Sequence, residues 1–306
     1  MAVSEDSTLT ALDQQLARIE AGGRLSADEL AALAASADIL PLGMLADAAR
    51  RRLRGTTATY VRVALCPVTP PIEPGLILPA AREVRLSGAP DSLPAALSAV
   101  EAVRRPAGDR PISGYSWTDV ERWAEESAHP VPDVLAALRH AGLDALSEIP
   151  LDEVGNLAEA LDRLGHAGFQ KVRLTVTRPA PVRDLLPLFL RSAMLQDQFG
   201  LVEALNPLPL QLDALRPTSG YDDVRAVALA RLAVSNIPTI QVYWLRYGPK
   251  LAQVALTFGA DDLDTVPASD DAPDGRRRAP LEEVRRNIEA AGFRAVERDG
   301  RFGSVA

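Results

Sequence analysis

Residues 236–264 have the sequence NIPTIQVYWLRYGPKLAQVALTFGADDLD and mix strand, turn and helix signals with aromatic residues. Thr239 to Trp244 alternate and are β-branched or aromatic, which predicts a strand, and Gly248-Pro249 then interrupts the chain. Apolar residues recur at helical spacing from Leu251 to Phe258, and Gly259 provides a stop signal. The stretch therefore predicts a strand, a turn and a short apolar helix.

An acidic run, Asp261, Asp262 and Asp264, follows this helix. Carboxylates beyond a helix C-terminus oppose the helix dipole, so they do not stabilise the helix. They indicate either a solvated loop or a role beyond helix stability, and the sequence favours the solvated loop.

The composition describes a globular chain of 306 residues with 47% apolar residues and a formal net charge of −8. The acidic residues are scattered, so nothing favours nucleic acid or an anionic membrane as a partner. The polar start, MAVSEDSTLT, lacks the features of a signal peptide, and charges interrupt every apolar stretch well short of the roughly 20 residues that span a membrane. We expect a cytoplasmic protein without a membrane span.

Six strand-like runs alternate with helical ones between Ala58 and Ala233. The clearest is KVRLTVTR, residues 171–178, which alternates strictly. The pattern predicts an α/β fold, an incomplete (β/α)6 TIM-like barrel with N-terminal helices and a C-terminal strand-helix extension. The expected segments are an N-terminal helical segment, residues 1–57, the partial barrel, residues 58–235, and an extension packed on it, residues 236–306.

Several stretches resemble the radical-SAM enzymes of the futalosine route to menaquinone, namely aminofutalosine synthase and cyclic dehypoxanthine futalosine synthase. They include residues 236–264 and four further motifs: LGMLADAARRRLRG (42–55), AGLDALSEIP (141–150), LRSAMLQDQFG (190–200) and VERDGRFGSV (296–305). The resemblance implies a radical-SAM barrel. In that family a Cys-x3-Cys-x2-Cys loop binds a [4Fe-4S] cluster, which cleaves S-adenosylmethionine to a radical.

The sequence departs from the family after the first predicted strand, where it has CPVTPPIEPGLILP, residues 66–79, with Cys66 as the sole cysteine. A [4Fe-4S] cluster that binds a cofactor at its fourth iron needs three protein thiolates. His129, His140 and His166 show no paired ligand spacing, so we expect no metal and no [4Fe-4S] cluster. This argues against radical-SAM catalysis and favours Cys66 as a buried, small apolar residue. We expect the proline loop, residues 67–79, to cover the barrel mouth.

Glu148 is the leading candidate for a catalytic residue. Glu148-Ile149 stands where the resembling family has Glu-Ile at the end of its fourth strand, although the family's glycine triplet is absent. A carboxylate at the C-terminal end of a barrel strand can bind ribose hydroxyls or act as an acid or base. A salt bridge or a helix cap is the structural alternative.

Five further residues are candidates for ligand binding: Arg62, Ser87, Gly88, Arg173 and Asn206. Ser87-Gly88 resembles the family's glycine turn beside the cofactor amine, although such a turn also lets any strand meet a helix. Since a barrel gathers its strands around one axis, we expect Arg62, Arg173 and Asn206 to converge with Glu148. A buried ion-pair network is the alternative for this group.

Two functional hypotheses follow. The first is a cluster-free, catalytically degenerate protein with an accessory, scaffold or nucleoside-binding role in futalosine-route menaquinone synthesis. Its partner would be a cysteine-bearing paralogue or another enzyme of that pathway, and its ligand S-adenosylmethionine or a related nucleoside. The second is a non-radical enzyme that acts on a nucleoside or an aryl carboxylate in the barrel pocket, with Glu148 as acid or base.

Overall fold

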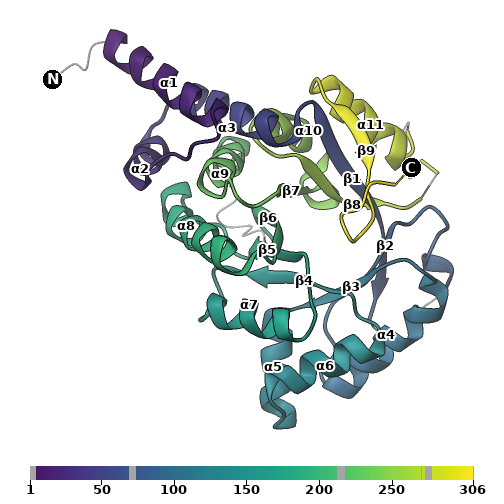
Figure 1. Cartoon of the computed structure of the whole chain (residues 1–306). Coiled ribbons are helices and arrows are strands. Elements are labelled where there is room, and N and C mark those ends of the chain that lie inside the picture. Colours follow the sequence, from purple (N-terminus) through teal and green to yellow (C-terminus); the bar gives the residue numbers. More distant parts are fainter. Residues whose placement is uncertain (1–4, 69–73, 212–217, 270, 273–277, 306) are drawn as a thin grey trace.

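Eight parallel strands close into a barrel in the computed structural model, which describes residues 5–68, 74–211, 218–269, 271–272 and 278–305. The ring closes because β1 pairs with β2 on one side and with β8 on the other. Figure 1 shows these strands as a ring with helices outside it. The strands are β1 (Thr57–Pro67), β2 (Glu83–Ser87), β3 (Ile112–Ser116), β4 (Ala145–Pro150), β5 (Val172–Val176), β6 (Val202–Pro209), β7 (Thr239–Tyr243) and β8 (Asp262–Pro267).

Helices cover the outside of the ring and follow most strands directly, as a βα repeat requires. Three helices precede the barrel, namely α1 (Glu5–Glu20), α2 (Ala27–Ala35) and α3 (Ile39–Arg54). The others are α4 (Leu93–Ala107), α5 (Trp117–Ser127), α6 (Val131–Ala141), α7 (Leu157–His166), α8 (Val182–Phe199), α9 (Gly220–Ala233), α10 (Trp244–Thr257) and α11 (Pro280–Ala290), with a short 3-10 turn, η1 (Pro74–Leu76), after β1.

The predicted α/β class and the TIM-like barrel are confirmed, but the barrel has eight strands rather than six. The predicted strand from Thr239 to Trp244 is β7, which pairs with β6 and β8 and is part of the barrel wall. Much of residues 236–306 therefore completes the ring that the sequence predicted to be incomplete. Short parallel strands with polar inward faces lack the apolar runs by which buried strands are usually identified.

The prediction of a solvated acidic loop is wrong. Asp262 and Asp264 belong to β8 and are fully buried, and Asp261, which precedes the strand, is 2% exposed. Arginines from distant segments neutralise them: Arg298 contacts Asp262 at 2.7 Å, and Arg85 contacts Asp264 at 3.0 Å. Buried carboxylates need such partners, and the local sequence does not reveal them.

Gly248 interrupts α10 where the sequence predicts a break. Its backbone has φ of 71° and ψ of 174°, so the chain leaves the helical conformation between Tyr247 and Pro249. Glycine reaches this region without the clash that a Cβ atom would cause. The kink lets Leu245 and Arg246 remain near the end of β7 while the longer second part of α10 packs on the barrel.

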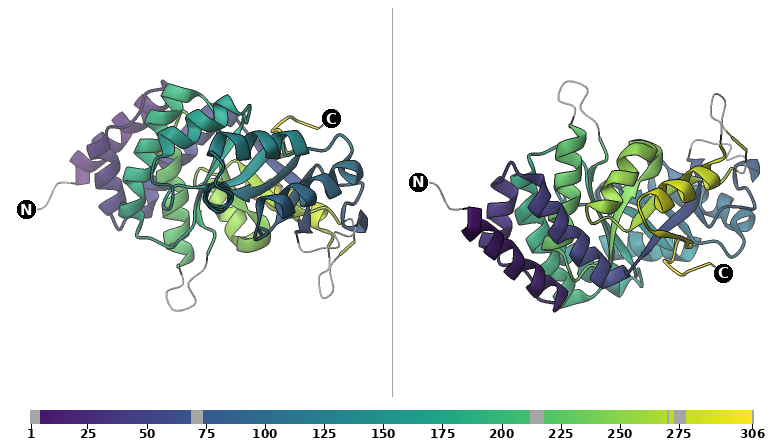
Figure 2. Two further views of the ribbon diagram at one scale, coloured as in Figure 1. Left: turned by 90° about the horizontal axis from the view of Figure 1, so that it is seen from below. Right: turned by 90° about the horizontal axis from the view of Figure 1, so that it is seen from above.

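A ninth strand and the C-terminal tail lie at the end of the barrel where the strands begin. β9 (Arg294–Glu297) pairs in parallel with the first residues of β1, whereas β2 pairs with the last ones. The tail then turns inward, so that the carbonyl oxygen of Gly300 accepts a hydrogen bond of 3.0 Å from Arg173 inside the barrel. Figure 2 shows β9 and α11 on one side of the barrel and the N-terminal helices on the other.

The N-terminal helices pack on α8 and α9. Ser26 and Glu29 form the capping box that the sequence predicts for α2, with hydrogen bonds of 3.2 and 2.8 Å. At the end of α3, the buried Arg50 donates to the carbonyl oxygens of Ala260, Gly55 and Thr57. Burial lowers the pKa of Arg50 to about 10. This arginine fixes α3 to the base of the barrel.

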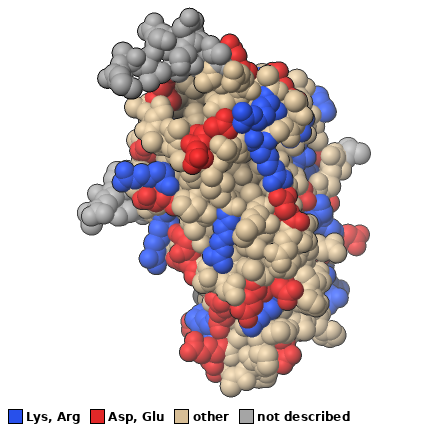
Figure 3. Space-filling model, turned by 60° about the vertical axis from the view of Figure 1, so that its left-hand side comes forward, with Lys and Arg blue, Asp and Glu red and all other residues tan. Residues whose placement is uncertain are grey.

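Basic and acidic side chains are interspersed over the face shown in Figure 3. Among the described residues, no helix is both long and apolar enough to cross a membrane. The proline loop predicted to cover the mouth includes residues 69–73, which lie outside the described part of the chain, so that prediction stays open.

Candidate functional site

A cavity of about 570 Å³ lies at the C-terminal mouth of the barrel. The residues around it come from the ends of six strands or the turns that follow them: Leu65 (β1), Ser87 and Gly88 (β2), Ser116 (β3), Glu148 (β4), Tyr243 (β7) and Thr265 (β8). Active sites of βα barrels lie at this end, because the strand ends and their loops converge there. The volume is in the range of small-molecule sites, about 300 to 1,000 Å³.

Glu148 lines this cavity without a fixed partner. Its carboxyl group makes no hydrogen bond or ion pair with any residue that the structure describes. Burial raises the pKa of Glu148, and the attraction of Arg85 opposes that effect without cancelling it. An uncommitted carboxyl with a raised pKa can accept hydrogen bonds from a ligand or exchange a proton with it.

Two other polar groups near Glu148 also have unused hydrogen-bonding capacity. Tyr243 is 6% exposed, and its hydroxyl group has no hydrogen-bond partner among the described residues. Burial raises the pKa of Tyr243, which keeps the hydroxyl protonated and able to donate. Arg246, at the start of α10, lines the cavity and forms no ion pair with a described residue. The cavity thus offers a carboxyl, a phenol and a guanidinium group to a ligand.

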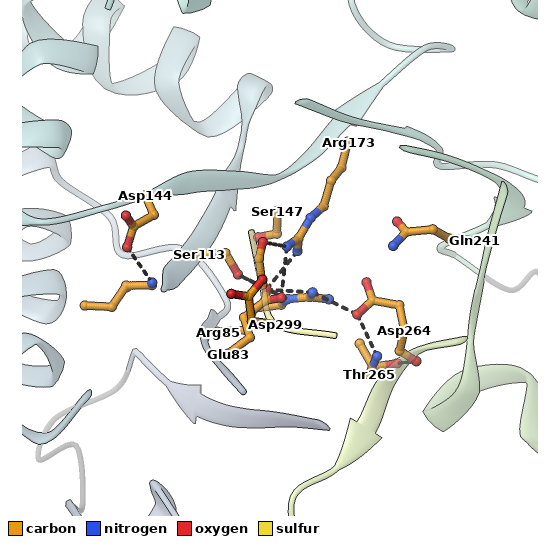
Figure 4. A network of polar contacts seen from close by, with 12 residues as sticks. Glu83, Arg85, Ser113, Asp144, Ser147, Arg173, Gln241, Asp264, Thr265 and Asp299 are labelled. Carbon is orange, nitrogen blue, oxygen red and sulfur yellow. Dashed lines mark hydrogen bonds and ion pairs between the residues drawn. The ribbon is translucent and has the colours of Figure 1, made fainter. Parts of the chain in front are cut away.

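A buried ion network fills the barrel beneath the cavity. Glu83 accepts hydrogen bonds from Arg85 at 2.7 Å and from Arg173 at 2.8 and 2.9 Å. Because β2 and β5 are not neighbours in the ring, the bonds between Glu83 and Arg173 must cross the barrel interior. Ser113 also donates to Glu83, and Arg85 reaches Asp264 at 3.0 Å, as Figure 4 shows. Arg85 both belongs to this network and lines the cavity.

Opposite charges control the ionisation of this network. Burial alone would raise the pKa of Glu83, but the attraction of Arg173 and Arg85 holds that pKa well below its usual range. Burial would lower the pKa of Arg85, whereas Asp264 and Glu83 raise it. Glu83 and Arg85 are therefore charged near neutral pH, and the floor of the cavity is a set of paired charges.

A second set of ion pairs links β8 to the C-terminal tail. Arg298 makes two hydrogen bonds of 2.7 Å to Asp262, and Gln241 donates to the same carboxylate at 2.8 Å. The centre of the Phe302 ring lies 4.1 Å from the guanidinium carbon of Arg298 and 5.3 Å from that of Arg173. The tail therefore closes the end of the barrel where the strands begin, while the cavity lies at the end where the strands finish.

The candidate residues predicted from the sequence fall into two groups. Glu148, Ser87 and Gly88 line the cavity together. Arg173 lies in the buried network below, and Arg62 pairs with Glu297 of β9 at 2.6 Å. Asn206 is fully buried, and its side-chain oxygen accepts from the backbone of Leu208 at 3.1 Å. The structure therefore does not bring Arg62, Arg173 and Asn206 to the cavity beside Glu148.

Sequence reasoning missed Arg85, Tyr243, Arg246 and Thr265 as cavity residues. Arg85 and Ser87 occupy alternate positions of EVRLSG, so they share one face of β2. This alternation is enough to identify Arg85 as a neighbour of Ser87 in the cavity. Tyr243 and Arg246 lie within residues 236–264, but only the closure of the barrel brings them to the same cavity as Glu148.

The donor set of this mouth does not fit an iron-sulfur cluster. Cys66 is fully buried, its sulfur atom lies 4.0 Å from the carbonyl oxygen of Ala64, and burial raises the pKa of its thiol. A thiolate is the form that binds iron. No group of three His, Cys, Asp or Glu residues in the described ranges is arranged to hold a metal ion. Cys66 is buried as predicted.

The C-terminal third of the chain matches a known protein family. Residues 210–304 match the CofH/MqnC C-terminal region. Aminodeoxyfutalosine synthase of Thermus thermophilus is 29% identical over 229 residues, which are 63% of this chain and 60% of that enzyme. The enzyme of the same name from Streptomyces coelicolor is 26% identical over 228 residues, which are 62% of this chain and 59% of that enzyme. The resemblance to futalosine-route radical-SAM enzymes is confirmed.

A further relative is 5-amino-6-(D-ribitylamino)uracil–L-tyrosine 4-hydroxyphenyl transferase of Methanopyrus kandleri, 29% identical over 66% of this chain and 63% of that enzyme. The chain spans about 60% of the length of the curated relatives that it matches.

Solved structures share the fold. Methylornithine synthase has a TM-score of 0.65 at 13% identity, with 92% of this chain and 97% of the other covered. The hydrogenase maturase HydG of Carboxydothermus hydrogenoformans has a TM-score of 0.66 at 13% identity, with 95% and 80% covered. This likeness confirms the α/β barrel fold.

Proposed function

We propose that this chain is a cluster-free relative of the futalosine-route enzymes that binds a nucleoside-type ligand at its barrel mouth and acts as an accessory protein. The observation that carries the proposal is the cavity of about 570 Å³ with an uncommitted Glu148. The thiols that could bind a cluster are reduced to one, and that one is buried. The chain thus combines the elements of a ligand pocket with the loss of the radical-generating centre.

The chemistry of the cavity suits a nucleoside. Glu148 can accept hydrogen bonds from two vicinal hydroxyl groups, as a ribose presents them. Gly88 has φ of +88° and no side chain, so a ligand can approach the backbone of the turn after β2 closely. Leu65, Leu86 and Leu245 supply apolar surface for a base or an aromatic ring. S-adenosylmethionine and adenosine both carry these groups.

The pathway assignment rests on the relatives, whose names include aminodeoxyfutalosine synthase. An accessory protein that keeps such a barrel but not the cluster would bind a pathway nucleoside or a cysteine-bearing paralogue. Co-purification with such a paralogue from the native host would support the accessory role.

Anaerobic reconstitution with iron and sulfide is expected to leave the protein without a stable cluster, because one thiol cannot replace three. The measurement is the visible absorbance and the iron content after desalting. Cys66→Ser is the control and should retain the same background iron as the wild type. Stoichiometric iron that the wild type keeps and the serine variant loses would overturn the cluster-free proposal.

A nucleoside ligand is expected to raise the melting temperature. A ligand that binds only the folded state stabilises it by about 2.7 kcal/mol at one hundred times its dissociation constant. The panel is S-adenosylmethionine, adenosine, futalosine-type nucleosides and aryl carboxylates, each measured by differential scanning fluorimetry and calorimetric titration. If none of them binds, the pocket has no nucleoside role and the scaffold alternative remains.

A non-radical enzyme is the second candidate, and the raised pKa of Glu148 favours it. A carboxyl group whose pKa is raised by burial is suited to general acid or base catalysis on a bound nucleoside or aryl carboxylate. The same panel separates the candidates: product formation that Glu148→Gln abolishes supports the enzyme, and binding without turnover supports the accessory protein.

A further inference from the structure

Another polar cavity, of about 400 Å³, lies at the opposite end of the barrel from the mouth. It lies at the N-terminal ends of the strands, because it is lined by Ile112, the first residue of β3, and by Asp144, which directly precedes β4. The mouth, by contrast, is built from the C-terminal ends of the strands. The charged residues that line the cavity at the N-terminal ends are Arg104, Asp109, Arg110, Arg139, Asp144 and Arg301. We call this cavity the arginine cleft.

The arginine cleft carries excess positive charge on a chain whose net charge is −8. Four arginines and two aspartates line it, which gives a formal charge of +2. The C-terminal ends of α4 and α6 also reach it, and each contributes about −0.5 through the helix dipole. About one positive charge thus remains uncompensated. Interaction with the negative ends of α4 and α6 therefore does not explain why four arginines gather here.

Arg104 and Arg139 have guanidinium edges that remain unused. Arg104 donates only through Nη1, to the carbonyl oxygens of His140 at 3.2 Å and Ala141 at 3.4 Å. Arg139 likewise uses only Nη1, which donates to the carbonyl oxygens of Leu143 and Asp144. Among the described residues, neither arginine has a carboxylate within 4.0 Å, and their Nε and Nη2 groups have no hydrogen-bond partner. The ring of Phe169 lies against the Arg139 guanidinium group, with its centre 5.2 Å from the guanidinium carbon, and leaves the edge of that group free.

The two aspartates do not neutralise these edges. Asp144 accepts from the backbone nitrogen of Ile112 at 2.8 Å and from Arg301 at 3.2 Å, so both its oxygens are committed. The side chain of Asp109 is exposed and forms no hydrogen bond with a described residue. The backbone carbonyl of Asp109 accepts from Arg301 at 3.2 Å, which keeps the tail beside the cleft.

We propose that the arginine cleft binds a small phosphate-bearing anion, such as a phosphate monoester, through the free edges of Arg104 and Arg139. A guanidinium edge matches two oxygens of a phosphate with parallel hydrogen bonds, and charge-assisted bonds of this kind are the strong ones. A phosphate anion would also compensate the excess positive charge of the cleft. The site is independent of the cavity at the mouth, since no residue lines both.

Calorimetric titration with inorganic phosphate, in chloride buffer at constant ionic strength, tests this proposal. The wild type is expected to bind phosphate, and Arg104→Gln or Arg139→Gln should weaken binding at least ten-fold. Arg105→Gln is the matched control, because Arg105 is the exposed neighbour of Arg104 on α4 and does not line the cleft. Equal affinity in the Arg104 and Arg105 variants would overturn the assignment.

Asp109→Asn supplies a gain of affinity that a damaged fold cannot imitate. Removing this exposed negative charge from the cleft should tighten phosphate binding several-fold, and high salt should reduce the gain. Malonate tests the class of anion, because it presents two carboxylates instead of a tetrahedral phosphate. Malonate that binds as tightly as phosphate, or a wild type that binds neither, would refute the phosphate site.

Discussion

Replacing Glu83 with Gln is expected to lower the free energy of unfolding by about 3 to 5 kcal/mol, the usual cost of breaking a buried ion pair. Glu83 is fully buried and is the shared acceptor of Arg85 and Arg173. Once Glu83 has lost its charge, Asp264 is the one carboxylate among the described residues that still pairs with either buried arginine, and of the two it contacts Arg85 alone. Urea unfolding monitored by circular dichroism gives the free energy directly.

Glu126→Gln is the matched control, because it makes the same chemical change in an exposed pair. Glu126 lies 3.5 Å from Arg122 on α5, and exposed pairs of this kind contribute about 0.3 to 0.5 kcal/mol. A Glu83 variant that is as stable as the Glu126 variant would show that the network does not hold the barrel together.

The pH dependence provides a second check on Glu83. Its pKa is depressed in the folded state, so its stabilising effect is fully present above the ordinary value of 4.5 and is lost as the pH falls below it. The wild type should therefore lose stability more steeply than Glu83→Gln between about pH 4.5 and lower values, and the two curves should approach each other in acid.

Those strands and helices that have a clear local sequence pattern could be predicted. KVRLTVTR alternates, and the structure has β5 from Val172 to Val176 within that stretch. β8 was missed because its sequence, DLDTVP, places two carboxylates on one face, which is typical of a solvated segment. Only tertiary structure brings Arg298 and Arg85 to Asp262 and Asp264. Without β8 the ring cannot close, so an eight-stranded barrel was out of reach.

The same limit applies to the site. Glu148, Ser87 and Gly88 could be found because each lies in the last residues of a predicted strand or directly after it, where the sequence resembles the family's motifs. Arg173 lies inside the barrel as expected. How far below the cavity its side chain lies could not be predicted, because that distance depends on how the strands are shifted against one another around the ring. Arg62 pairs with Glu297 from β9, a strand that the sequence analysis did not predict.

Glu148→Gln is expected to weaken binding of the nucleoside ligand at least ten-fold while leaving the free protein at least as stable as the wild type. The first effect follows because an amide offers one acceptor oxygen where a carboxylate offers two, and it removes the charge that strengthens these hydrogen bonds. The second follows from the raised pKa: burial disfavours the ionised carboxyl, so a neutral replacement removes that cost near neutral pH.

Glu153→Gln is the control for this prediction. Glu153 follows β4 only five positions after Glu148, pairs with the exposed Arg178 at 3.4 Å and does not line the cavity. Calorimetric titration should give wild-type affinity for the Glu153 variant and a large loss for the Glu148 variant, with urea unfolding recorded for both. A Glu148 variant that loses several kcal/mol of stability yet binds as the wild type does would assign Glu148 to the structure of the barrel and leave the cavity without its central residue.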